Sequence, residues 1–475
     1  MAQRSLSTLP TMLFNLAALA LLSPPAVAQV PTVLTVGPAG TYANIQDAID
    51  VVVVGQDTEI RVQGLETYTE NLSISASFTS GSILLSGGWE STFNIHNDDP
   101  EDTVIDGDGS GVLDISIGGG SLEVRAFTLT NGFATQGAGV FIMPSGDAVV
   151  TLNKILVVEN TAASAADALG GGLWAILSGS QRLEIRDSDF FLNQAGSTGG
   201  DLALAGGVGI NAAGDSRVVI DEMEVVENHI QSSGADISGG GLFLQISETA
   251  EADLQGIFMS GNTGDSGSGD VSGVGGWWST SDSAVLRVER VGCVFNAGVG
   301  GDTGPQIRST HSGLSTVKMT EIGVAQGEAD GLSLDASGSS TVNLVNLTVV
   351  DHVGTGLELM KIGGTATLTL YNTIAFGNGV NFSDFGTGVD RGSNLIGVDP
   401  LFIDPSELDY HLMPGSPAFD VGDNTPPGGL GSTDFDERPR IADGTVDIGI
   451  FEGLIVILID GFESGNTSAW TNTVP

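Results

Sequence analysis

The chain has 475 residues, of which 70 are glycine, 41% are hydrophobic and only 15% are charged. A sequence this apolar can bury a long core, so its glycine-rich, low-complexity appearance does not indicate disorder. The formal net charge of −43 excludes nucleic acid as a natural partner. It also sets a repulsive average field against anionic polysaccharides, unless calcium bridges the two surfaces.

Residues 1–28 have the pattern of a secretory signal peptide. Arg4 supplies the positive charge, residues 12–22 are an apolar core, and Ala26-Val27-Ala28 is a small-residue cleavage site. The mature chain is therefore expected to begin near Gln29, outside the cytoplasm. An uncleaved anchor is the alternative, but the apolar stretch is shorter than the roughly 18 to 20 residues that span a bilayer. We expect no transmembrane helix elsewhere, and an exported monomer.

A repeat follows, in which a short apolar run closes on asparagine. Successive asparagines are separated by 29, 33, 35, 34 and 34 residues, a period typical of stacked repeats. These are Asn131, Asn160, Asn193, Asn228, Asn262 and Asn296. Two pairs of alternating apolar residues precede five of these asparagines, as in Val150/Leu152 and Ile155/Val157 before Asn160. Such alternation indicates strands.

A glycine turn and a third apolar run complete each repeat, as in Gly170-Gly171-Gly172-Leu173. Three short strands per repeat predict an all-β fold, a single-stranded right-handed parallel β-helix over residues 29–398. A large antiparallel sandwich is the alternative, but sandwiches do not show strict repetition at this period. The asparagine side chains are expected to hydrogen-bond from one coil to the next, as amide ladders do in stacked strands.

The start of the β-helix carries a motif that predicts a cap. Ile45, Ala48, Ile49 and Val52 have helical spacing, so a short amphipathic helix capped by Asn44 can cover the end of the core. The segment from Gly40-Thr41-Tyr42 through Ile60-Arg61-Val62 resembles the start of the pectin-lyase-like β-helix superfamily. The Asn-then-Gly-Gly repeats are more loosely similar to those of polymorphic outer-membrane proteins.

Residues 399–453 form a second recognisable block. It contains Asp399-Pro400-Leu401-Phe402, Tyr410-His411-Leu412, Gly415-Ser416-Pro417-Ala418-Phe419-Asp420, Arg438-Pro439-Arg440 and Val446-Asp447-Ile448-Gly449. These pieces, in this order, resemble the closing module of the family called choice-of-anchor Q. The resemblance implies a non-catalytic domain that precedes a surface-attachment signal. Physically, we expect this module to seal the last coil. The tail at 454–475 is then a sorting tag, or alternatively a last strand with Trp470 covering apolar surface.

The residues six positions before each asparagine form the first candidate site. Five of the six are charged, and they make one outward column of mixed sign: Arg125, Lys154, Asp187, Glu222, Gly256 and Arg290. A polysaccharide lyase needs an Arg or Lys base beside calcium-binding acids, so this column is a candidate groove for an acidic glycan. The alternative is a solvated ladder of surface charges.

Three other candidate sites are weaker. Asp187, Asp189, Asp221 and Glu222 could supply the carboxylates of a glycoside hydrolase and His229 its histidine, although the sequence signatures of these enzymes are absent. A run of acids offers oxygens for calcium but lacks the spacing of a known calcium loop, namely Asp98, Asp99, Glu101, Asp102, Asp106 and Asp108. Trp277 and Trp278 are adjacent on an expected strand, so one of them can be exposed to stack on a sugar.

Two functions of different class remain open. The favoured one is an exported, non-catalytic surface β-helix for adhesion, glycan binding or envelope structure, whose partner is a glycan or a surface protein. The alternative is a calcium-assisted lyase or a glycoside hydrolase that acts on an acidic glycan. Calcium is the only cofactor that the sequence suggests. The fold alone does not decide, because β-helices host both functions.

Overall fold

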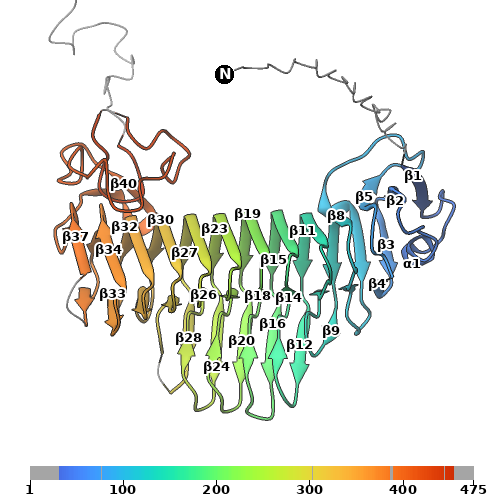
Figure 1. Cartoon of the computed structure of the whole chain (residues 1–475), viewed down its shortest axis with the longest axis horizontal. Helices are drawn as coiled ribbons and strands as arrows, with labels where there is room; N and C mark the ends of the chain where they lie inside the picture. The colour runs from blue at the N-terminus through green and yellow to red at the C-terminus, as the bar shows by residue number, and fades with distance from the viewer. Residues whose placement is uncertain (1–30, 76, 302, 386–388, 443, 454–475) are drawn as a thin grey trace, which may run out of the picture.

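The computed structural model describes residues 31–75, 77–301, 303–385, 389–442 and 444–453. The predicted signal peptide and the C-terminal tail lie outside these residues. The chain forms a long rod of stacked coils, with its N-terminal part at one end and its C-terminal part at the other (Figure 1). Among the described residues, no helix is both long enough and apolar enough to span a membrane.

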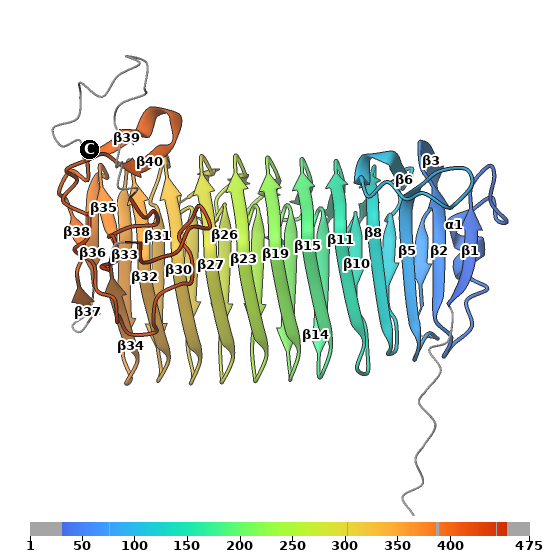
Figure 2. The ribbon, with the colours of Figure 1, turned by 90° about the horizontal axis from the view of Figure 1, so that it is seen from above.

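Sheet A lines one side of the rod (Figure 2). Its strands pair in parallel and in register from coil to coil. The main stack contains β1 (Thr32–Val36), β2 (Thr58–Gln63), β5 (Ser82–Trp89), β8 (Ser121–Thr130), β11 (Val149–Val158), β15 (Arg182–Phe191), β19 (Arg217–Val226), β23 (Glu251–Ser260), β27 (Val285–Val294), β30 (Thr316–Ala325), β32 (Thr341–Val350), β34 (Thr367–Tyr371) and β37 (Val389–Gly392). Shorter members continue it, namely β3 (Glu66–Thr69), β6 (Thr103–Asp106), β35 (Ile374–Phe376) and β38 (Leu395–Ile396).

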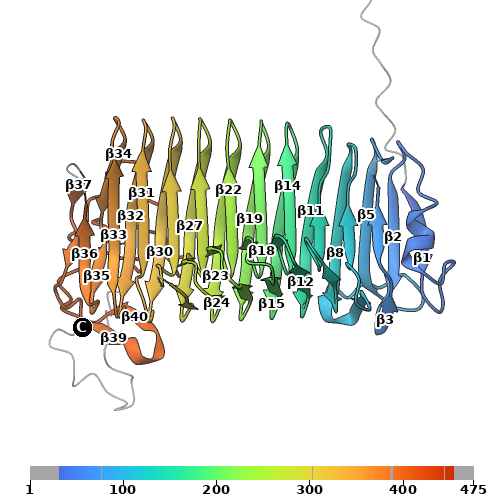
Figure 3. The same ribbon diagram turned by 90° about the horizontal axis from the view of Figure 1, so that it is seen from below.

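Sheet B lies across the core from sheet A and is parallel throughout its eleven strands (Figure 3). These are β4 (Leu72–Ile74), β7 (Leu113–Ile115), β10 (Val140–Ile142), β14 (Leu173–Ser178), β18 (Val208–Ala213), β22 (Leu242–Ile246), β26 (Gly276–Thr280), β29 (Ile307–His311), β31 (Leu332–Ser337), β33 (Thr355–Ile362) and β36 (Val380–Asp384). Together with sheet A they confirm the predicted right-handed parallel β-helix.

The middle coils carry a side lobe that the sequence analysis did not predict. Its strands form two small parallel sheets, seen as a separate row below the main body in Figure 1. Sheet C contains β9 (Phe133–Ala134), β12 (Thr161–Ser164), β16 (Gln194–Ser197), β20 (His229–Ser232), β24 (Thr263–Ser266) and β28 (Ala297–Val299). Sheet D contains β13 (Ala168–Leu169), β17 (Ala203–Leu204), β21 (Ile237–Ser238) and β25 (Val271–Ser272). Each middle coil therefore has more than the three predicted strands.

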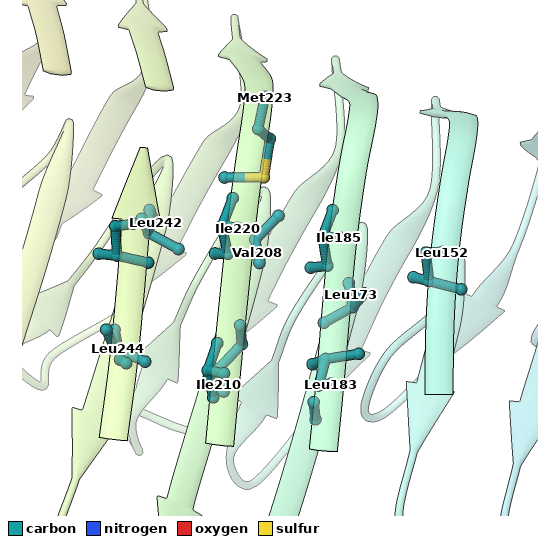
Figure 4. Packing of buried hydrophobic residues seen from close by; sticks show 14 of the residues in the cluster. Leu152, Leu173, Leu183, Ile185, Val208, Ile210, Ile220, Met223, Leu242 and Leu244 are labelled. Atoms are coloured by element: carbon teal, nitrogen blue, oxygen red, sulfur yellow. The ribbon is translucent and has the colours of Figure 1, made fainter. Parts of the chain in front are cut away.

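The two predicted apolar pairs of a coil lie on one strand of sheet A, not two. Residues such as Glu222 (φ +58°) adopt left-handed backbone in the middle of the strand and bend it. Both halves still point their apolar residues inward, as Ile220 and Met223 do (Figure 4). Leu and Ile from sheet B meet them from the other side, so the coils stack into one continuous core.

The asparagine ladder is confirmed. Asn228 is fully buried, and its Nδ2 donates to Oδ1 of Asn262 at 3.1 Å and to the carbonyl of Phe190 at 2.8 Å. The same coil-to-coil bond recurs from Asn160 through Asn296, where Gln306 accepts the last one. Asn131 is not part of it, because Gly132 occupies the equivalent position and its N–H donates to Asn160. The predicted register of that first coil is therefore wrong by one residue.

The N-terminal helix α1 (Ile45–Ile49) covers the first coil, with Ile45, Ala48 and Ile49 buried. The prediction that Asn44 caps it is wrong, because the Asn44 side chain makes no capping hydrogen bond. Instead the carboxylate of Glu70 accepts the first two helical N–H groups, from Ile45 at 2.8 Å and Gln46 at 2.9 Å. A carboxylate suits a helix N-terminus because the exposed N–H groups there carry partial positive charge.

The C-terminal module begins with the hairpin of β39 (Phe402–Asp404) and β40 (Asp409–Leu412), joined by the short helix η2 (Pro405–Glu407). The module contacts Leu395 of β38 in the last coil, and the expectation that it seals that coil stays a prediction. It folds back over the outer face of sheet A, where Phe435 meets Gly292 of β27 and Ile450 meets Gly323 of β30. The glycines provide the flat surface that these large side chains need, and Figure 1 shows the module above β32 and β34.

Candidate functional site

The predicted charge column occupies the bends of the sheet A strands. The left-handed residues at these bends are in register from coil to coil, and they include Lys154, Asp187, Glu222, Gly256 and Arg290. In β8 the equivalent residue is Ala126, and Arg125 pairs with Asn153, so Arg125 is not a member of the column. The column marks a backbone corner, which is a structural reason for its regular spacing.

The two cations proposed as a catalytic base are both engaged in ion pairs. Arg125 Nε donates to Asp98 Oδ1 at 2.6 Å, and Lys154 Nζ donates to Asp98 Oδ2 at 2.7 Å. The hydrogen bond to Asp98 raises the pKa of Arg125, and the two cations hold the pKa of Asp98 well below its usual range. An arginine whose pKa is raised is a poorer base, so this pair does not support the lyase hypothesis.

The remaining predicted acids are spread over two coils with different partners. Glu222 passes over Gly256 and reaches Arg290 Nη2 at 2.6 Å, two coils away. Arg290 in turn binds Glu437 of the C-terminal module at 2.6 Å. Asp221 accepts from Arg186 at 3.4 Å, and His229 Nδ1 lies 2.9 Å from the hydroxyl of Thr263 in the side lobe. His229 is therefore outside the row of acids that it was predicted to complete.

Asp189 and Glu224 are the two acids that face each other directly. They are register partners on β15 and β19. Partial burial raises the pKa of Asp189, and the neighbouring Glu224 charge raises it further. Like charges on directly opposite residues destabilise a sheet. The hydrogen bonds and ion pairs around this pair therefore do not explain why two acids stand side by side here.

The predicted calcium ligands do not converge. Asp98 is neutralised by two cations, Asp99 caps the short helix η1 (Pro100–Asp102), and Asp102 accepts from Asn97 at 2.5 Å. Asp106 accepts a hydrogen bond from the Asn131 side chain, and Asp108 lies two residues further on, where its backbone N–H donates to Asp106. In the described part of the chain, no three His, Cys, Asp or Glu side chains are grouped to hold a metal ion. The predicted calcium site therefore gains no support from the arrangement of these side chains and stays a prediction.

Trp277 and Trp278 point to opposite sides of β26, as strand alternation predicts. Trp278 is fully buried in the core, whereas Trp277 is half-buried on the outer face of sheet B. Trp277 belongs to an outward row of register partners, which we call the aromatic row: Phe141, Trp174, Phe243 and Trp277, with Gly209 between the second and third.

The aromatic row is packed as a unit. The rings of Phe243 and Trp277 stack with centroids 4.7 Å apart and planes 2° apart, and Trp174 lies 6.0 Å from Phe243. A Cβ on Gly209 would fall 2.2 Å from the Trp174 ring, so the missing side chain makes room for that indole. Leu169 and Leu204 of sheet D pack beside the row. The row thus lies where the side lobe meets sheet B.

A second outward row runs beside the aromatic row on the same strands. Its members are mainly amides and hydroxyls in register: Asn211, Gln245, Ser279 and Thr310. Thr310 donates to Ser279 at 3.1 Å. Beyond Trp277 the aromatic row itself continues as Arg308, which donates to Ser333 and Asp335. Sheet B therefore carries partly exposed aromatic rings beside hydrogen-bonding groups.

Of the aromatic row, only Trp277 was predicted from the sequence. The sequence does contain a pattern that marks the row. Trp174, Phe243 and Trp277 each follow a glycine turn, and each comes one residue after the first inward-facing residue of its strand. Aligning the coils on that turn would have placed them in one column. Phe141 follows Gly139 and Val140 in the same way.

No family model and no curated protein matches the chain. Among solved structures, the chain is similar to the crystal structure of pectate lyase Pel9A, at 12% identity over 90% of this chain and 97% of that chain, with a TM-score of 0.46. It is also similar to the pectin methylesterase from Aspergillus niger in deglycosylated form, at 16% identity over 59% of this chain and 87% of that chain, with a TM-score of 0.27. These values assign no family, so the fold assignment rests on the strand register, and the choice-of-anchor Q resemblance stays a prediction.

Proposed function

We propose that this chain is an exported, non-catalytic β-helical protein that binds a glycan along the aromatic row of sheet B. The observation that carries the proposal is the in-register alignment of Phe141, Trp174, Phe243 and Trp277 on one outer face. Phe141 and Trp277 are half-buried, so part of each ring is available to a ligand, while Trp174 and Phe243 are buried and support them.

The chemistry of this face suits a sugar chain. Aromatic rings offer flat apolar faces against which the C–H side of a sugar ring packs, and nearby polar groups fix its hydroxyls. Asn211, Gln245 and Ser279 provide those groups on neighbouring strands. Strands are spaced about 4.8 Å apart, so Phe141 and Trp277 are separated by roughly 19 Å, enough for a chain of several sugars.

The proposal is tested by removing one of the two half-buried aromatic side chains. Trp277→Ala is expected to weaken binding to a panel of insoluble and soluble polysaccharides by about tenfold, measured by affinity electrophoresis and calorimetry. Phe295→Ala is the matched control, because Phe295 is an exposed aromatic outside the row. Equal binding by the two variants, or no binding by the wild-type protein to any polysaccharide, would contradict the proposal.

We propose further that the protein is retained at the cell surface through residues 454–475. The support is the signal-like pattern of residues 1–28 and the resemblance of residues 399–453 to a module that precedes attachment signals. Deleting residues 454–475 is expected to move the protein from the cell-surface fraction to the medium. An unchanged distribution would show that this tail is not the attachment signal.

One observation supports a catalytic alternative. Asp189 and Glu224 face each other on adjacent strands, and a raised pKa on one of two neighbouring carboxyls is the pattern of glycoside hydrolases. A hydrolase would shorten polysaccharides in solution, and Asp189→Asn would lower that activity by at least a hundredfold. Release of reducing ends by the wild-type protein but not by this variant would replace the non-catalytic proposal.

A further inference from the structure

A groove opens at the N-terminal end of the aromatic row. It has a volume of about 600 Å³ and is formed by the first three strands of sheet B, β4, β7 and β10. Ser73, Asp114 and Phe141 are register partners on these strands and line the groove. The segments 110–111 and 134–137 lie beside them, where the side lobe begins. Phe141 thus belongs both to the groove and to the aromatic row.

The groove contains polar groups that the protein leaves available. The Asp114 side chain reaches solvent there, and the surrounding groove wall raises the pKa of its carboxyl by partial desolvation, with no hydrogen bond or ion pair from the described residues contributing. Asn71 uses its Nδ2 to hold the carbonyls of Gly107 and Gly111, at 2.8 and 3.0 Å. Its Oδ1 is left as an acceptor, and Gln136 and Ser110 line the groove as well.

The charge of the groove restricts its ligand. Its lining includes one acid and no Lys, Arg or His. A uronate would approach Asp114 without a counter-charge, on a chain whose net charge is −43. A carboxylate accepts hydrogen bonds from two adjacent hydroxyls, the pattern that vicinal diols of a sugar present. An aromatic face beside it can pack against the same ring.

We infer that this groove binds one ring of an uncharged hexose or pentose chain, with Asp114 accepting two sugar hydroxyls and Phe141 packing against the ring. The inference deepens the proposed function, on which it rests, by naming the substrate class as a neutral glycan. It excludes the acidic glycan of the lyase hypothesis. It also places the groove and Trp277 on the same outer face of sheet B, at the two ends of the aromatic row.

Calorimetric titration of the full chain with defined hexasaccharides tests the inference. The probes are cellohexaose, xylohexaose and mannohexaose as neutral chains, hexagalacturonate as an anionic chain, and hexaglucosamine as a cationic chain. At least one neutral chain is expected to bind, with Kd raised about tenfold in Asp114→Asn, a loss typical of one or two charge-assisted hydrogen bonds. The control is Asp265→Asn, because Asp265 is an exposed carboxylate on sheet C, away from the groove.

The outcomes separate this inference from the proposed function. If Trp277→Ala weakens binding and Asp114→Asn does not, the aromatic row binds the glycan and the groove does not. If hexagalacturonate or hexaglucosamine binds more tightly than every neutral chain, the assignment of a neutral glycan is wrong while glycan binding stands. If the wild-type protein binds none of the five probes or the polysaccharides above, both proposals fall together.

Discussion

At the scale of single residues, the asparagine ladder stabilises the rod most directly. Asn228 illustrates this, because its buried side chain donates to two carbonyls and one amide oxygen, and accepts from the Asn193 side chain at 3.0 Å. Removing it leaves several buried backbone groups without partners, and each such group costs about 1 to 3 kcal/mol. The ladder therefore ties each coil to two neighbours through groups that water cannot replace.

Asn228→Ala is expected to lower the free energy of unfolding by roughly 3 to 5 kcal/mol, because several of these bonds are lost together. Urea unfolding followed by circular dichroism measures it. Asn211→Ala is the matched control, since Asn211 lies on the outer face of sheet B and should cost about 0.5 kcal/mol or less. Equal losses in the two variants would show that the ladder is not a main source of stability.

Gly209 is the second informative residue. A Cβ there would collide with the Trp174 ring, whose atoms lie 2.2 and 2.4 Å from the Cβ position. Gly209→Ala should therefore displace the indole, cost about 1 to 3 kcal/mol and change tryptophan fluorescence. Gly234→Ala is the control, since its added Cβ would have no atom nearer than 3.7 Å. Identical spectra for both variants would contradict the packing described for the aromatic row.

The sequence was sufficient where a residue's role depends on period alone. The inward apolar pairs, the ladder from Asn160 to Asn296 and the opposite faces of Trp277 and Trp278 all follow from strand alternation. It misplaced Asn131 because that asparagine is the left-handed residue (φ +56°) next to the ladder position, not at it. Asparagine suits both places, so its identity could not choose between them.

At the scale of elements, the C-terminal module is fixed to sheet A by a buried charge cluster. Arg440 is 2% exposed and lies 3.3 Å from Glu321 of β30 and 3.4 Å from Glu452. Its Nη1 donates to the carbonyl of Ile450 at 3.0 Å, and Nη2 to that of Asp447 at 3.1 Å. Asp434 and Asp447 are buried nearby, so this one arginine faces an excess of acids.

This excess makes docking of the module depend on protons. Burial raises the pKa of Glu452 to about 8 and raises that of Glu321 well above its ordinary value, despite the opposing effect of Arg440. A carboxyl whose pKa is raised in the folded state contributes stability below its unfolded pKa, about 4.3. That contribution falls as pH rises and is lost above the folded pKa. Docking should therefore weaken between about pH 4.5 and pH 8.

Trypsin cleavage after Arg440 reports undocking, because trypsin must bind the arginine side chain, and this side chain is buried in the docked module. The cleavage rate of the wild-type protein, corrected for the pH dependence of trypsin, is expected to rise at least tenfold from pH 7 to pH 9. In Glu452→Gln the rise should be much smaller, since the neutral amide has no charge to gain. Glu437→Gln is the control, because Glu437 is exposed and pairs with Arg290. A pH-independent rate in the wild-type protein would overturn the argument.

Elements that depend on tertiary contacts could not be predicted. Residues 194–204 of the side lobe are rich in Ala, Gly and Ser, so sheets C and D have little apolar alternation to reveal them. The module's position follows from Gly292, Gly323 and the buried Glu321, which read as ordinary strand residues in the sequence. The groove could not be predicted for the same reason. Asp114 and Phe141 are far apart in the sequence, and only the pairing of β7 with β10 brings them together.

At the scale of the whole molecule, the strands of each middle coil pair only with strands of the two coils beside it. Stability is then close to a sum over coils and their interfaces, and removing one full period should leave the others intact. Residues 228–261 are one such period, because β19 and β23 pair with a constant offset of 34 residues, as in Val226 and Ser260. Their deletion joins Glu227 to Asn262 and brings β19 beside β27.

The shortened protein is expected to fold with an unchanged circular dichroism spectrum per residue. Val218 and Leu286 both pair with Ala252 in the full chain, so once Ala252 is deleted they should pair with each other in the same register. It also loses Phe243, which shortens the aromatic row by one step of about 4.8 Å. A hexasaccharide should then bind more weakly, while a trisaccharide held in the groove at Asp114 is unaffected.

Deleting residues 228–244 instead removes half a period and turns inward residues toward solvent, so that variant should not fold. If both deletions fold, or neither does, the coils are not the independent units that the strand register implies.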